Sequence, residues 1–147
     1  MSNIYALDLA LDLSAATPEE VLALVRWHLG QGLEQAVDGA FSDGSESDAF
    51  PLWSGRGPAH RIGGVLLGEL ARGASGWSLT VRQEIHAEEL PDLRGLLGRL
   101  TRHGASDGLI GQIRFHETDL PDVLFNRSGN LTQCVLRGRE EVVALAD

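Results

Sequence analysis

Hydrophobic and polar residues alternate strictly along several stretches of this chain, the pattern typical of β-strands with one buried face. The clearest stretch is 77–86, where one predicted face carries Trp77, Leu79, Val81, Gln83 and Ile85 and the other carries polar residues. A second apolar stretch, 61–71, precedes it, and the glycine-rich segment 72–76 lies between them. The pattern therefore predicts a hairpin whose loop has roughly four residues.

The segment 3–14 alternates in the same way and predicts another strand. It is followed by a helix-start pattern in which Thr17 is the expected N-cap and Pro18 the first helical residue. Leucines at helical spacing predict a second helix over 88–102, and alternation returns over 109–116.

The order strand, helix, hairpin, helix, strand predicts an α+β fold of the ferredoxin-like βαββαβ type. Right-handed connections would give an antiparallel sheet with both helices on one face. The segments 123–125 and 131–137 flank a turn and predict a C-terminal strand or hairpin extension. We expect a single domain, 1–147, with a long irregular excursion over 32–60, and a strand or short helix over 140–145.

Charged side chains then fall on the sheet face away from the predicted helices. The strand that carries Asp8 and Asp12 would lie between the strands that carry Arg82 and Arg114, so acids face bases across strands. These four residues are the candidate ligand-binding set. The same face would carry Glu84, His86, Gln112 and His116. The simplest interpretation is a solvated face whose ions pair across strands.

Two functions follow from this face. Val65 and Leu67, with Ile4 and Ile110 at strand ends, are apolar residues expected on it, so we expect a second subunit, the long loop or a ligand to cover the sheet. The first hypothesis is therefore a non-enzymatic protein-binding or regulatory module of the immunity type. It would act through the open sheet face, as a homodimer or with another protein.

The alternative hypothesis is a small ligand-binding or enzymatic domain. In that case His86 or His116 would act as a base that Glu84 or Asp12 orients. Arg82 or Arg114 would hold a polar or anionic small molecule.

Composition narrows the function classes. The net charge of −9 argues against nucleic acid and allows a basic protein partner. All twelve basic residues are arginine, which excludes lysine Schiff-base and Walker A chemistry and suggests a GC-rich bacterial genome. One cysteine, Cys134, and an N-terminus without a signal-peptide pattern favour the cytoplasm, and no segment has membrane-spanning length. Histidine and cysteine spacings match no metal motif, so neither metal nor cofactor is predicted.

Overall fold

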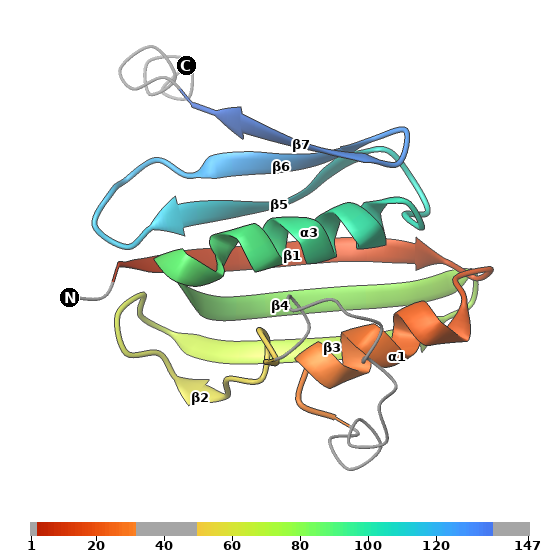
Figure 1. The fold of residues 1–147 in the computed structure, drawn as a ribbon, viewed down its shortest axis with the longest axis horizontal. Coiled ribbons are helices and arrows are strands. Elements are labelled where there is room, and N and C mark those ends of the chain that lie inside the picture. The colour runs from red at the N-terminus through yellow and green to blue at the C-terminus, as the bar shows by residue number, and fades with distance from the viewer. Residues whose placement is uncertain (1–2, 32–49, 137–147) are drawn as a thin grey trace.

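The computed structural model describes residues 3–31 and 50–136. Within these residues the chain forms one antiparallel sheet of seven strands and two α-helices, and both helices lie on the same face of the sheet (Figure 1). The strand order is β2-β3-β4-β1-β5-β6-β7. The prediction of an α+β fold is therefore confirmed. The segments 32–49 and 137–147, and with them most of the predicted excursion and the 140–145 element, lie outside the described residues.

The elements follow one another along the chain with short connections where both ends are described. The strands and helices are β1 (Ile4–Ser14), α1 (Glu19–His28), β2 (Gly57–Pro58), β3 (Val65–Gly73), β4 (Gly76–His86), a 3-10 helix (Ala87–Glu89), α3 (Leu90–Thr101), β5 (Gly108–Phe115), β6 (Asp122–Arg127) and β7 (Asn130–Val135). No helix among them is both long enough and apolar enough to cross a membrane.

The hydrophobic core lies between the helices and the sheet, as the alternation predicts. β1 contributes Leu7, Leu9, Leu11 and Leu13, each no more than 3% exposed. Leucines and one valine of α1 and α3 pack against them in the same cluster. The alternating leucines of β1 therefore form a strand and not a helix, because only a period of two puts all four on the core side.

Two local predictions are wrong. Pro18, not Thr17, is the residue before α1, and the Thr17 hydroxyl instead donates a hydrogen bond to the Ser14 carbonyl oxygen at 2.6 Å. The β3–β4 loop is also shorter than expected. Gly73 pairs with Gly76, so the hairpin turns through two residues, 74 and 75. The second hairpin, β6–β7, also turns through two residues, Ser128 and Gly129, and both have positive φ angles, as a type I′ turn requires.

β5 contains a bulge that the alternation did not reveal. The register with β6 shifts between Leu109 and Gly111. A bulge puts one extra residue on one strand and reverses the side-chain direction beyond it. Ile110, predicted to face away from the helices, is therefore buried in the core, and Leu109 is 64% exposed.

The chain before β2 is held by hydrogen bonds between side chains and the backbone. The Gln83 side chain, on the core side of β4, accepts a hydrogen bond from the Gly55 amide and donates to the carbonyl oxygens of Gly55 and Leu67. The Arg56 guanidinium donates to four carbonyl oxygens, among them that of Leu29 just after α1. Trp53 is fully buried and anchors this segment to the core.

Candidate functional site

The sheet face away from α1 and α3, here called the outer face, carries every residue of the predicted ligand-binding set. Strand register places Asp8 of β1 between Arg82 of β4 and Gln112 of β5. Leu67 of β3 pairs with Arg82, and Val123 of β6 pairs with Gln112. One row across the outer face thus has a charged pair at its centre and an apolar side chain near each end.

Asp8 and Arg82 form the ion pair that the sequence predicts. The Asp8 Oδ1 atom lies 3.5 Å from the Arg82 Nε atom, and the two side chains are 43% and 28% exposed. The Arg82 guanidinium also donates a hydrogen bond to the Gly63 carbonyl oxygen at 2.9 Å. Asp12 lies opposite Ser78, whose hydroxyl donates to Asp12 Oδ1 at 3.0 Å. Within the described part of the chain Asp12 therefore has a neutral partner, and of these two aspartates only Asp8 pairs with an arginine.

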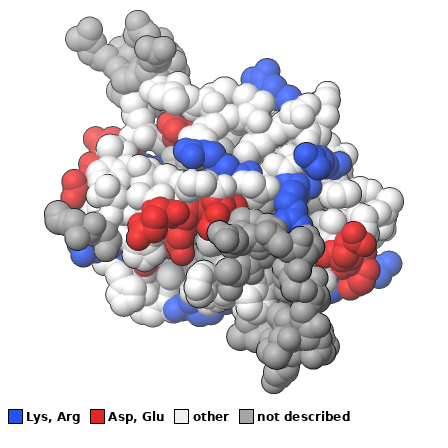
Figure 2. Space-filling model, in the orientation of Figure 1, with Lys and Arg blue, Asp and Glu red and all other residues white. Residues whose placement is uncertain are grey.

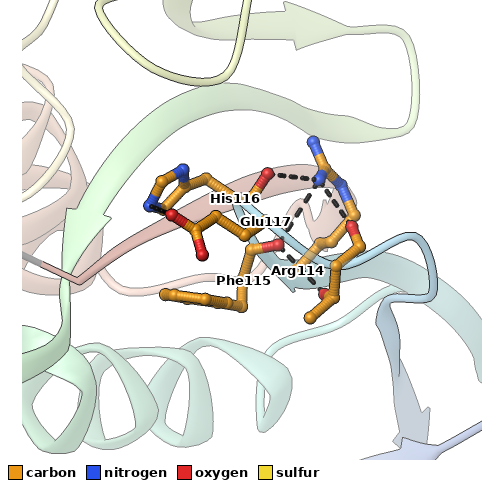
Figure 3. Close-up of polar contacts among 5 residues, drawn as sticks. Arg114, Phe115, His116 and Glu117 are labelled. Atoms are coloured by element: carbon orange, nitrogen blue, oxygen red, sulfur yellow. Dashed lines mark hydrogen bonds and ion pairs between the residues drawn. The ribbon is translucent and has the colours of Figure 1, made fainter.

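Arg114 is on the outer face but serves the loop that follows β5. Its register partner on β1 is Ala6. Figure 3 shows its guanidinium turned toward backbone oxygens, and Nη1 lies 3.3, 3.2 and 2.8 Å from the carbonyl oxygens of Phe115, His116 and Thr118. The structure thus brings Asp8 to Arg82 and engages Arg114 elsewhere.

Glu84 holds the segment that precedes β3. Its Oε2 atom accepts hydrogen bonds from the backbone N–H groups of Arg61 and Ile62, the latter at 3.2 Å. Burial by itself would raise the pKa of Glu84. Backbone hydrogen bonds from Arg61, His60 and Ile62, with the nearby His60 ring, outweigh burial and lower the pKa. Glu84 is therefore an ionised carboxylate that anchors the backbone of the segment before β3 to β4.

The two histidines lie on either side of β1. His86 is the register partner of Ile4, and the His116 N–H donates to the Ile4 carbonyl oxygen. Two strand spacings therefore separate them, about 10 Å. His86 ends β4 and is the N-cap of the 3-10 helix, and its backbone N–H donates to the Glu89 carboxylate at 2.9 Å. His116 Nε2 lies 3.8 Å from Glu117 Oε2 (Figure 3).

These contacts do not assemble an acid–base constellation. Among the described residues, no hydrogen bond or ion pair joins His86 or His116 to Glu84 or Asp12, the partners that the enzymatic hypothesis assigns to them. The described chain also holds no cluster of three or more potential metal ligands. A catalytic role for these residues stays a prediction.

A shallow hollow occupies the middle of the outer face. Its volume is about 460 Å³, and it is mainly apolar. Small side chains, Ala10 of β1 and Thr80 of β4, lie at its floor, and the larger Leu67 and Leu109 flank it. Leu67 is 40% exposed and Leu109 is 64% exposed. The hollow exists because short side chains at the centre of the sheet are surrounded by long ones.

Sequence reasoning found part of this surface. It placed Val65 and Leu67 on the outer face, and both are exposed there. It missed Leu109 because the β5 bulge reverses the alternation, and one period-two pattern contains no signal for such a shift.

Comparisons with known proteins assign no family. A scan of the chain against protein-family models returns no match, and searches of curated proteins and of solved structures return none either.

Proposed function

We propose that this chain is a non-enzymatic, regulatory protein-binding module whose outer face binds a second copy of the same chain. The observation that carries the proposal is the apolar hollow flanked by the exposed side chains of Leu67 and Leu109. Large apolar side chains that gather on an exposed surface are typical of protein interaction sites. A second sheet packed on this one would remove both leucines from water.

The charges around the hollow favour a second copy. In a two-fold symmetric interface the same surface meets itself, so it must be complementary to itself. Asp8 and Arg82 lie side by side at the hollow. A two-fold rotation about an axis near this pair would place Asp8 of one copy opposite Arg82 of the other. Such an interface needs about 800 Å² from each copy to be stable.

The distribution of acidic residues argues against a basic protein as the occupant of the outer face. Acidic side chains gather on the opposite, helix-bearing face, near the beginning of α3 (Figure 2). Glu88, Glu89 and Asp92 belong to the turns at that point. On the outer face, Asp8 and Glu84 already have partners of positive or partly positive charge. Among the described residues that line the hollow, the charged side chains are Asp8 and Arg82, and their ion pair balances the charge there.

We further propose that the central elements form a ferredoxin-like core. In its support, β3-β4-β1-β5 is a continuous part of the strand order, and α1 and α3 precede the strands at its two ends. β6 and β7 would extend this core. We also infer that the module works in the cytoplasm, because Cys134 is the single cysteine of the chain and no internal disulfide can form.

The experiment is to measure the mass of the particle in solution. Sedimentation or light scattering of the wild-type chain should give a dimer, and Leu67→Glu combined with Leu109→Glu should give a monomer because both carboxylates would be buried unpaired. Val135→Glu is the matched control, since Val135 is 66% exposed and lines a cavity on the helix-bearing side. Circular dichroism verifies that all three proteins keep their fold.

Two results would overturn the proposal. The first is a wild-type chain that stays monomeric at concentrations of about 100 μM, which means an association free energy weaker than about −5.5 kcal/mol. The second is a dimer that the double substitution leaves intact. If the chain is instead a monomer that binds a basic protein through Leu67 and Leu109, the proposed binding surface is right, but its partner is not a second copy of the chain.

A further inference from the structure

A second cavity lies on the opposite side of the sheet, between α3 and the C-terminal hairpin. In Figure 1, α3 lies over β1 and β5, and β6 and β7 extend beyond it. The cavity lies beside α3, where β6 and β7 extend beyond the helix. Its volume is about 340 Å³, within the range of small-molecule sites. Its apolar wall is formed by Tyr5, Leu93, Leu97, Ile113, Leu124 and Leu131.

The apolar wall is rigid, because it is part of the core. Leu93, Leu97 and Leu124 are each no more than 2% exposed, and all three belong to the main hydrophobic cluster. They come from α3 and β6, two elements that the sheet holds in place. A ligand would therefore meet an apolar surface that already exists, which reduces the entropic cost of binding.

One polar group at the rim is oriented by a chain of hydrogen bonds. Arg94 Nε donates to Gln133 Oε1 at 3.3 Å, and Gln133 Nε2 donates to Asp122 Oδ2 at 2.7 Å. All three side chains line the cavity. The amide of Gln133 thus bridges the Arg94 guanidinium and the Asp122 carboxylate, and the exposed Arg94 side chain has one hydrogen bond that directs it toward the rim.

The terminal amino groups of Arg94 are left for a ligand. Among the residues that the structure describes, the Arg94 guanidinium donates one hydrogen bond, to Gln133 and through Nε. The two remaining nitrogens form the planar fork that binds a carboxylate through two parallel hydrogen bonds. A charged fork at the rim and an apolar wall behind it match a molecule with one acidic end and one apolar end.

We propose that this cavity binds a small carboxylic acid with an apolar body. The carboxylate is held by the Arg94 fork, and the body packs on the leucines of α3 and on Leu124 of β6. This site lies on the other side of the sheet from the proposed dimer surface. The two proposals therefore succeed or fail separately.

Three probes of equal chain length separate charge from apolarity: octanoate, octan-1-ol and octylamine. Calorimetric or NMR titration of the full-length chain should give binding of octanoate, weaker binding of octanol and the weakest binding of octylamine. Arg94→Gln should raise the octanoate dissociation constant by roughly tenfold, the usual worth of a charged hydrogen bond, and leave octanol binding unchanged.

Two further variants make the test specific. Arg102→Gln removes an arginine that follows α3 and does not line the cavity, so octanoate binding should stay at the wild-type level. Leu131→Trp places a larger side chain in the cavity and should abolish binding of both octanoate and octanol. Thermal melting verifies that each variant folds.

Four results would overturn the proposal: no binding of any probe, octanol binding as tightly as octanoate, octanoate binding that Arg94→Gln does not weaken, and preferential binding of octylamine. The last would assign the site to a cation, with Asp122 as its partner, and Asp122→Asn would then abolish it.

Discussion

Asp8 and Arg82 face each other across β1 and β4, with Asp8 Oδ1 3.5 Å from Arg82 Nε at the edge of an apolar hollow. The pair is about one third exposed on average, so water and salt screen it. Exposed pairs of this kind contribute between about 0 and 1 kcal/mol to folding. Its importance therefore lies in where it sits, beside the surface that we propose as the dimer contact.

We expect Asp8→Asn to lower the free energy of unfolding by less than about 1 kcal/mol at low salt. The difference should shrink at about 1 M sodium chloride, where charges are screened within about 3 Å. Urea denaturation of dilute protein at the two salt concentrations measures it. Asp119→Asn, in an exposed loop, is the control and should leave the free energy of unfolding unchanged at both salt concentrations. A large, salt-independent loss for Asp8→Asn would mean that the carboxylate has a structural partner other than Arg82.

The second prediction concerns acid stability. Glu84 accepts backbone hydrogen bonds from Arg61 and Ile62, and these lower its pKa in the folded chain. A group whose pKa is lowered by folding stabilises the fold above its unfolded pKa. That stability is lost as the pH falls through the folded pKa. Glu84→Gln should therefore lower the free energy of unfolding at neutral pH and flatten its decline in acid.

Urea denaturation at a series of pH values tests this. The difference between wild type and Glu84→Gln should be largest at neutral pH and should narrow as the pH falls below the ordinary pKa of a glutamate, about 4.3. Glu69→Gln, an exposed carboxylate on β3, should show no such convergence. Curves of wild type and Glu84→Gln that stay parallel down to low pH would refute the assignment.

The sequence predicted the elements that alternate or repeat cleanly. β1 presents one apolar face, and β4 presents one that Gln83 interrupts; these faces decide both strand type and orientation. The pairing of Asp8 with Arg82 followed from the same alternation once the strand order was set. These features depend on local pattern, which a single chain shows.

What the sequence did not predict depends on contacts between distant segments. Glu84 reads as a surface carboxylate, and only the return of the 60–62 segment turns it into a backbone acceptor. Arg114 likewise reads as a strand-face cation, and the following loop captures its guanidinium. The cavity beside Arg94 needs β7 next to α3, a packing that no periodicity in either element encodes.

The β5 bulge gives the last prediction. At Gly111, a Cβ atom would overlap the Asp8 carbonyl oxygen and press on the Leu9 Cα atom of β1. Backbone in the middle of a sheet cannot move aside cheaply. We therefore expect Gly111→Ala to lower the free energy of unfolding by about 2 kcal/mol or more, the usual range for overpacking. Chemical denaturation measures the loss.

Gly95, in α3, is the matched control, because a Cβ atom there would have no neighbour within 4 Å. Alanine in an exposed helix position is favoured over glycine by roughly 0.5–1 kcal/mol. The same chemical change should thus stabilise the chain at Gly95 and destabilise it at Gly111. Equal effects at both sites would mean that Gly111 of β5 is not held in close contact with the Asp8–Leu9 backbone of β1.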